Sequence, residues 1–134
     1  MATIQNITFA CEEPVRLAEF WEAALGYGRP EFPEEFLREI DAAIERGELD
    51  ATGWAMLVPP DGQGPRLLFQ RRPKSPTESI PIHLDLHAED REAEVERLVG
   101  LGATVVETRS HRVASVEETW TVMTDPEGNG FCVQ

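Results

Sequence analysis

Two passages of this sequence match each other: Trp54-Ala-Met-Leu-Val-Pro-Pro-Asp-Gly-Gln-Gly-Pro-Arg-Leu-Leu-Phe-Gln70 and Trp120-Thr-Val-Met-Thr-Asp-Pro-Glu-Gly-Asn-Gly-Phe-Cys-Val-Gln134. Each passage is an apolar run that begins with tryptophan, a turn rich in proline, glycine and acidic residues, and a second apolar run that ends on glutamine. This order is typical of a β-hairpin. The match predicts that one hairpin pattern occurs twice in the chain.

The match continues upstream of each hairpin. Residues 4–10 and 80–87 alternate in the manner of a strand, and residues 14–25 and 91–101 carry apolar side chains at helical spacing. A repeat on this scale predicts two similar modules. A chain of 134 residues is long enough for both modules to share one domain.

The repeat predicts an α+β fold in which two tandem βαβββ modules form a single domain, residues 1–134, with a shared cavity. Module one covers residues 1–72, a linker covers 72–79, and module two covers 80–134. Each helix should cover the apolar face of its sheet, because both apolar surfaces must be buried. The polar strand faces then line the cavity, which is the usual setting for a ligand site.

One segment of the first module, residues 29–53, has no counterpart in the second. Within it, residues 33–49 place Phe36, Leu37, Ile40 and Ile44 at helical spacing. We expect an inserted amphipathic helix that either covers an opening of the cavity or contacts a second subunit. In the second module, we expect a short strand at 104–107 and a polar loop at 109–118.

The composition limits the partners and the location of the protein. Twenty-five acidic side chains against 12 basic ones give a formal net charge of −13, which repels nucleic acid and anionic membrane surfaces. The two cysteines, Cys11 and Cys132, are too few for a disulfide framework, so we expect a cytoplasmic protein. No apolar run is long enough to span a bilayer, so we expect a soluble one.

Several motifs of the chain resemble the vicinal oxygen chelate superfamily, also called glyoxalase/bleomycin-resistance/dioxygenase, and in particular its small bacterial glyoxalase-like members. The similarity covers nearly the whole chain except the inserted helix. It depends on Glu13-Pro-Val-Arg-Leu-Ala-Glu-Phe-Trp21, Gly64-Pro-Arg-Leu-Leu-Phe-Gln70, His83-Leu-Asp-Leu86 and Asp125-Pro-Glu-Gly-Asn129. The resemblance implies the paired-module fold, and it implies a homodimer.

The resemblance also implies where a metal would bind, because the enzymes of the superfamily hold one divalent cation between their modules. Carried onto this chain, the ligand positions are Asn6, Leu68, His83 and Cys132. Leu68 offers no donor, and a shift of register replaces it with Gln70. Since hard and borderline cations prefer carboxylate and imidazole ligands, we expect no metal and no other cofactor. If a divalent metal does bind, we expect His83 to hold it together with Asn6, Gln70 or Asp85.

For three further groups of residues, the sequence leaves more than one role open. His83 and Asp85 share a strand face, which suits either a catalytic base held by a carboxylate or a metal site, and equally a pair whose hydrogen bonds are satisfied within the fold. Cys132 is a candidate nucleophile, although a small apolar filler is the favoured interpretation. Trp54 and Trp120 form either flat ligand walls or packing contacts.

These observations predict a metal-free protein that binds a small molecule, with a possible role in sequestration or resistance. The alternative is a lyase, isomerase or epimerase that stabilises an enediolate with a metal or base at His83, for which His83 and Asp85 are the catalytic candidates. A third hypothesis is an interaction module that docks a partner through the helix at 33–49. The predicted ligand-binding residues are Asn6, Thr8, Trp54, Gln70, His83, Asp85, Trp120, Cys132 and Gln134.

Overall fold

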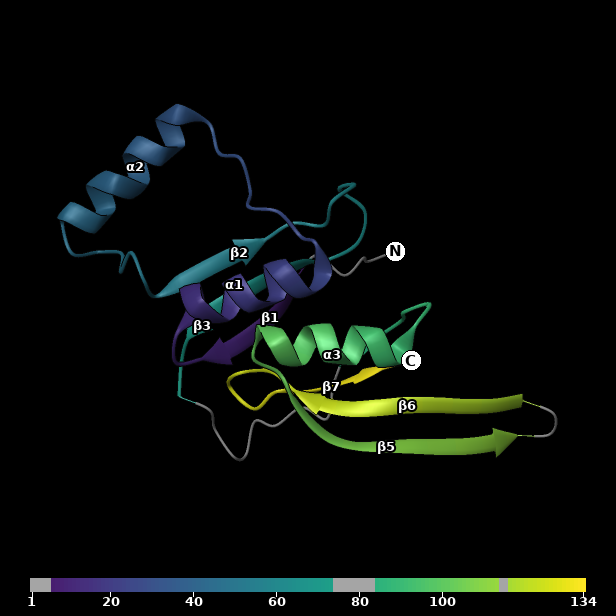
Figure 1. Cartoon of the computed structure of the whole chain (residues 1–134). Helices are drawn as coiled ribbons and strands as arrows, with labels where there is room; N and C mark the ends of the chain where they lie inside the picture. Colours follow the sequence, from purple (N-terminus) through teal and green to yellow (C-terminus); the bar gives the residue numbers. More distant parts are fainter. Residues whose placement is uncertain (1–5, 74–83, 114–115) are drawn as a thin grey trace. The chain divides into compact units, whose positions relative to one another are not determined.

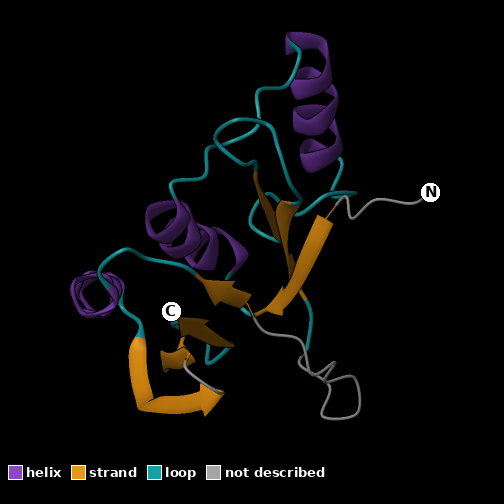
Figure 2. Cartoon of the chain, turned by 90° about the vertical axis from the view of Figure 1, so that its right-hand side faces the viewer, coloured by secondary structure: helices purple, strands orange, loops and turns teal. Residues whose placement is uncertain are grey.

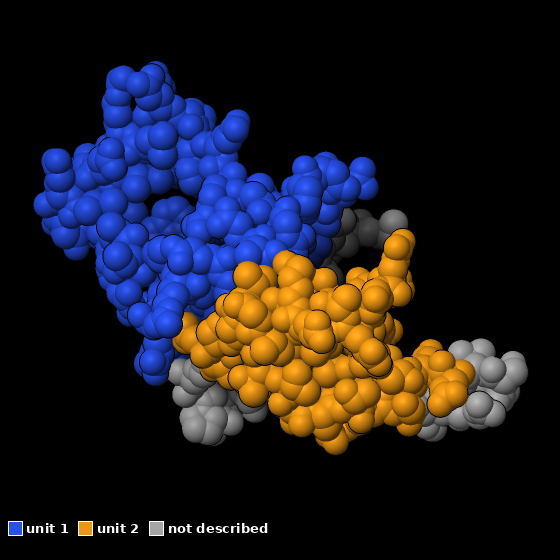
Figure 3. Space-filling view, viewed as in Figure 1, with its two compact units in different colours: residues 1–77 blue, residues 78–134 orange. Residues whose placement is uncertain are grey.

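The computed structural model of the chain describes residues 6–73, 84–113 and 116–134 (Figure 1). The chain divides into two compact units, residues 1–77 and 78–134 (Figure 3). Within the described residues, one unit contains a three-stranded sheet and the other a four-stranded sheet, and three helices accompany them. The predicted α+β class is therefore confirmed. The described part contains no helix that is both long and apolar enough to cross a membrane.

The first unit is built on a three-stranded sheet. Its elements are β1 (Asn6–Cys11), α1 (Pro14–Leu25), α2 (Glu34–Glu45), β2 (Trp54–Leu57) and β3 (Arg66–Arg71). Strand β3 lies in the centre, parallel to β1 and antiparallel to β2.

Helix α1 packs on one face of this sheet through its apolar stripe. Pro14 occupies its first turn, where a missing amide hydrogen is tolerated, and Gly26 ends it in the left-handed conformation with a φ of 67°. Trp21 is 1% exposed and lies against Phe9, whose ring stacks on Phe69 with the two centroids 5.0 Å apart. These aromatic contacts form the core of the first unit.

The segment that joins α1 to α2 pairs only briefly with the sheet. Gly28 forms an isolated bridge with Val58, at the place where a further strand of a βαβββ module would run. Pro30 and Pro33 follow, and neither has an amide hydrogen to give to a neighbouring strand. The first unit therefore pairs three strands, while the second pairs four.

The predicted helix at 33–49 is confirmed as α2, which is shorter than expected and ends at Glu45. Gly47 follows with a φ of 73°, a conformation that cannot continue a helix. Helix α2 contains no buried residue, and the side chains of Phe36 and Leu37 are 44% and 45% exposed. Figures 1 and 2 show α2 standing apart from the strands of its own unit.

The second unit contains β4 (Leu84–Leu86), α3 (Arg91–Leu101), β5 (Thr104–Val113), β6 (Val116–Thr124) and β7 (Gly130–Val133). The strand order is β4-β7-β6-β5, with β4 parallel to β7 and the other neighbours antiparallel. Asp90 caps α3 by accepting a hydrogen bond from the amide of Ala93 at 3.0 Å. Residues 74–79 of the predicted linker and His83 fall outside the described residues.

The polar loop expected at 109–118 is a wrong prediction. Strands β5 and β6 instead continue as a long antiparallel ribbon, in which Arg109 pairs with Trp120 and Ser110 pairs with Thr119. The ribbon is solvated along much of its length, so its side chains need no apolar alternation to hold the register. Its backbone pairing is supported by threonine and valine, which favour extended structure.

Helix α3 covers one face of the four-stranded sheet. Leu98 is fully buried there, and Met123, Phe131 and Val133 come from the strands with at most 1% exposure. Thr121 is buried on the same face, since the side chains of alternate β6 residues share a side. The opposite face of this sheet carries the polar side chains, as the alternation in the sequence predicts.

Candidate functional site

A cavity of about 530 Å³ lies on the face of the four-stranded sheet opposite α3. Cys132 on β7 pairs with Asp85 on β4 and with Val122 on β6, and Trp120 on β6 pairs with Arg109 on β5. Residues paired across neighbouring strands point to the same face, so these side chains form two adjacent rows. The cavity is lined by Asp85, Arg109, Glu118, Trp120, Val122, Gly130, Phe131, Cys132 and Gln134.

The structure brings four of the predicted ligand-binding residues together at this cavity. They are Asp85, Trp120, Cys132 and Gln134. Their alternate positions along β4, β6 and β7 place them on one side of the sheet. The volume is within the range of about 300–1,000 Å³ that is common for small-molecule sites.

Arg109 and Glu118 also line the cavity and were missed by the sequence prediction, which placed both in a loop. A usable signal existed for Glu118, because it is two positions before Trp120 and so belongs to the same strand face. Arg109 gave no such signal, because its place depends on the pairing of β5 with β6.

The charged groups of the cavity form a defined arrangement. The Arg109 Nε donates to Glu107 Oε1 at 2.8 Å, and this hydrogen bond, together with the negative charge of Glu107, raises the pKa of Arg109. Burial raises the pKa of the Cys132 thiol, and the charge of Asp85 raises it further, while Arg109 acts in the opposite direction. Cys132 is therefore a neutral thiol at physiological pH, which agrees with the filler interpretation and weakens the nucleophile one.

The remaining described candidates lie on the three-stranded sheet of the first unit. Asn6, Thr8, Trp54 and Gln70 share the sheet face opposite the one that carries buried Phe69. The Arg66 Nε donates to Asn6 Oδ1 at 3.0 Å, so the amide oxygen of Asn6 already accepts a hydrogen bond.

Comparison with known proteins connects this arrangement to a family. Residues 6–134 match the family model described as glyoxalase-like domain. The chain belongs to the glyoxalase-like domain family. The comparison with curated proteins found no match.

Solved structures share the fold of this glyoxalase-like chain. A glyoxalase/bleomycin resistance protein/dioxygenase family enzyme from Burkholderia phytofirmans PsJN has a TM-score of 0.65 and 15% identity, over 98% of this chain and 97% of that one. TnmS3, an antibiotic binding protein from Streptomyces sp. CB03234, has a TM-score of 0.59 and 15% identity, over 100% and 95%. A possible glyoxalase from Bacillus cereus has a TM-score of 0.58 and 16% identity, over 100% and 99%. At such identities these structures establish the fold and leave the activity open.

The described donors at the superfamily's metal positions do not fit a divalent cation. The oxygen of Asn6 accepts from Arg66, Leu68 has no donor atom, and Cys132 offers a thiol where hard and borderline cations prefer carboxylate or imidazole. Within residues 6–73, 84–113 and 116–134, no group of three or more His, Cys, Asp and Glu side chains is arranged to hold a metal. Metal occupancy remains a prediction, because His83 is outside these ranges.

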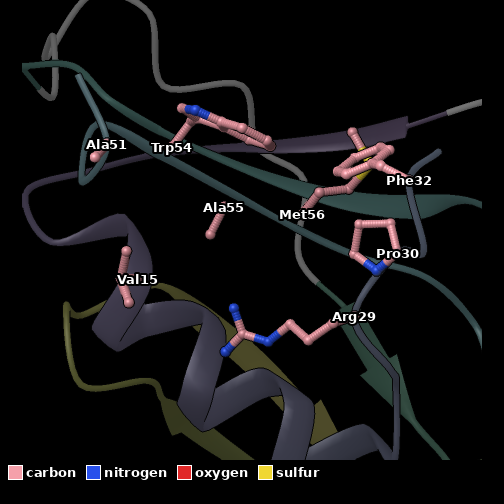
Figure 4. Close-up of a pocket in the computed structure, with 8 residues that line it drawn as sticks. All are labelled: Val15, Arg29, Pro30, Phe32, Ala51, Trp54, Ala55 and Met56. Carbon is pink, nitrogen blue, oxygen red and sulfur yellow. The ribbon is translucent and has the colours of Figure 1, made fainter. Parts of the chain in front are cut away.

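The glyoxalase-like chain has a second cavity, of about 270 Å³, in its first unit (Figure 4). It lies beside β2 and is mostly apolar, apart from the guanidinium of Arg29, which donates to Glu22 at 3.1 and 3.0 Å. Its lining residues are Val15, Arg29, Pro30, Phe32, Ala51, Trp54, Ala55 and Met56. Trp54 thus borders this cavity.

Proposed function

We propose that the protein binds a small organic molecule at the cavity of the four-stranded sheet and sequesters it without a metal ion. The observation that carries the proposal is the juxtaposition of one half-buried indole, Trp120, with the polar groups of Asp85, Arg109 and Gln134 around about 530 Å³. An indole face provides a broad apolar wall, and a few polar groups fix the orientation of a ligand.

The chemical state of two cavity residues suits the binding of a ligand. The raised pKa of Arg109 makes it a poor proton donor, and the raised pKa of Cys132 makes it a poor nucleophile. Both groups are suited to hydrogen bonding with a ligand that leaves unchanged. The antibiotic binding protein TnmS3 supports this proposal as an example of the same fold in a protein named for binding.

We propose further that the two units belong to one domain. Asn6, Thr8, Gln70 and His83 stay predicted members of the ligand site. Homodimer formation and a cytoplasmic location are parts of the same proposal.

The proposal is tested by screening drug-sized planar compounds for thermal stabilisation of protein that has been treated with a chelator. A compound that binds only the native state raises the melting temperature, and the rise grows with the logarithm of the ratio of its concentration to its Kd once that ratio is large. We expect the selected compounds to be recovered unchanged, and we expect the chelator to leave their affinity unaltered. Stabilisation that requires added divalent metal, or conversion of a compound to product, would support the alternative enzyme with His83 at its centre.

Two variants locate the site within the molecule. Trp120→Ala removes the indole wall and should weaken binding by about tenfold or more, because an aromatic contact of this kind is worth about 1 kcal/mol beyond the area that it buries. Trp54→Ala is the matched control, since it removes a tryptophan that borders the smaller cavity. Equal losses in both variants would argue against a site dominated by the four-stranded sheet.

A further inference from the structure

The outer edge of β2 has open backbone hydrogen-bonding groups. On its inner side β2 pairs with β3, and on its outer side Val58 exchanges two hydrogen bonds of 2.9 Å with Gly28. Successive residues of a strand direct their N–H and C=O groups to opposite edges. Trp54 and Met56 therefore direct theirs to the same edge as Val58, while Ala55 directs its groups toward β3.

The segment after Gly28 runs beside this edge without pairing to it. Continuing the antiparallel register from the Gly28–Val58 bridge would place Pro30 opposite Met56 and Phe32 opposite Trp54. Within the described residues, no hydrogen bond joins either pair. Pro30 has no amide hydrogen to donate to Met56, so the pairing is interrupted at that point.

The smaller cavity occupies the gap that this interruption leaves. Pro30 and Phe32 of this segment line it together with Trp54 and Met56 of β2 (Figure 4). An apolar hollow of about 270 Å³ thus lies next to unpaired donors and acceptors of a strand edge. Buried or partly buried backbone groups without partners favour a ligand that supplies them in the same alternation.

We propose that this gap is a second binding site, which accepts an extended peptide of another protein as an additional strand beside β2. The backbone groups of Trp54 and Met56 would bond the peptide main chain, and the hollow would take an apolar side chain. This is recognition by strand addition, in which the main chain supplies affinity and the pocket supplies specificity. The site is independent of the cavity of the four-stranded sheet.

The charge of the protein identifies the occupant as a neutral or basic peptide. A second copy of this chain also carries a net charge of −13, so long-range charge attraction favours a neutral or basic peptide over a second copy at this edge. Arg29 is already bonded to Glu22, whereas Glu31, between the two lining residues Pro30 and Phe32, forms no ion pair within the described residues. The chain's own segment is a poorer occupant, because Pro30 lacks a donor that a peptide residue in its place would supply.

The experiment uses a short acetylated and amidated peptide of alternating lysine and valine as the probe. The matched control peptide carries N-methyl groups on two adjacent central residues, which removes a donor from each of its edges while preserving charge and apolar side chains. We expect the control to bind about tenfold more weakly, since the loss of a main-chain hydrogen bond and the added steric hindrance act together. Equal binding of the two peptides would show charge attraction alone and would overturn the proposal.

Residue-resolved hydrogen exchange provides the second measurement. In the free protein the amides of Trp54 and Met56 should exchange rapidly, while those of Ala55 and Leu57, which bond β3, should exchange slowly. A saturating concentration of the probe peptide should slow amide exchange at Trp54 and Met56 by about tenfold or more. Exchange at Ala55 and Leu57 should stay unchanged. Slow exchange in the free protein at every concentration would show that residues 29–32 close the gap. Protection that rises with protein concentration would show that a second copy fills it, and either result would refute the proposed occupant.

Discussion

Replacing Thr121 by valine is the sharpest test of how the second unit holds its cavity wall. Thr121 is 1% exposed, and its neighbours in β6, Trp120 and Val122, line the cavity on the opposite face. Its Oγ1 accepts a hydrogen bond from Arg91 Nη1 at 2.7 Å and lies 3.0 Å from Thr108 Oγ1. The residue therefore ties α3 and β5 to the strand that carries the indole.

The expected loss in free energy of unfolding follows from the hydrogen-bonding groups that the substitution leaves without a partner. Valine preserves the shape of Thr121 and removes its hydroxyl, so a guanidinium hydrogen of Arg91 and the hydroxyl of Thr108 lose a partner. A full charged hydrogen bond is worth about 1.5–3 kcal/mol, but the Arg91 side chain is 23% exposed, and water replaces part of the loss. We expect the free energy of unfolding to fall by about 1–2 kcal/mol.

The assay is urea denaturation followed by tryptophan fluorescence and by circular dichroism. Thr119→Val is the matched control, because Thr119 lies on the same strand and its hydroxyl bond to Ser110 is exposed, so its cost should be below about 0.5 kcal/mol. Combining Thr121→Val with Thr108→Val should cost less than the sum of the single changes, since both partners of one hydrogen bond are then gone. A Thr121→Val protein as stable as wild type would refute this reasoning.

Four further outcomes are expected. Leu98→Ala should lower the free energy of unfolding by about 3 kcal/mol in urea denaturation, because this residue of α3 is fully buried; a cost below about 1 kcal/mol would contradict its place in the core. Asp90→Ala should cost about 1 kcal/mol in the same assay, and asparagine should restore most of it, since the side chain caps α3. Asp85→Asn should lower the pKa of Cys132 by removing a negative charge, and site-resolved mass spectrometry should show faster alkylation of this thiol at about pH 8. An unchanged alkylation rate would show that the charge of Asp85 does not influence the thiol. The hydrogen bond from Arg97 lowers the pKa of Glu94, so its contribution is complete above the ordinary value of 4.5 and is lost as the pH falls through the folded-state pKa. The cost of Glu94→Gln, at most about 1 kcal/mol at pH 7, should therefore shrink progressively in denaturation experiments at pH values below 4.5, and a cost that does not change with pH would contradict the assignment.

Helix α1 and the strands around the two turns were predicted correctly because burial enforces their periodicity: each places an apolar stripe or face against a core. Helix α3 buries Leu98 in the same way, whereas α2 was predicted from its apolar period although none of its residues is buried. The ribbon formed by β5 and β6 was missed because it is largely solvated. Its register depends on cross-strand backbone bonds, such as those around Arg109 and Trp120, which leave no apolar period in the sequence.

The same distinction between local and long-range information applies to the residues of the candidate site. Asp85, Trp120, Cys132 and Gln134 were found because period-two alternation places them on one strand face. Arg109 required knowledge of the strand pairing, which is a long-range property. The sequence was also silent on the acid-base state of Cys132, since that state depends on burial and on the charges of β4 and β5.

The two units differ in the segment that follows the first helix of each, which pairs as a strand in the second unit and not in the first. After α3, Gly102 ends the helix, and the chain enters β5 at Thr104 with every amide available for pairing. After α1, Gly26 ends the helix in the same left-handed conformation, yet pairing stops at the Gly28 bridge, and Pro30 follows. The missing amide hydrogen of Pro30 accounts for the chain leaving the sheet to form α2. It also accounts for the unpaired edge of β2. A residue at position 30 that supplies an amide hydrogen therefore removes one obstacle to pairing. In a Pro30→Val protein, we therefore expect the amides of Trp54 and Met56 to become protected from exchange without any peptide, and the probe peptide to bind more weakly as the chain's own segment competes for the gap.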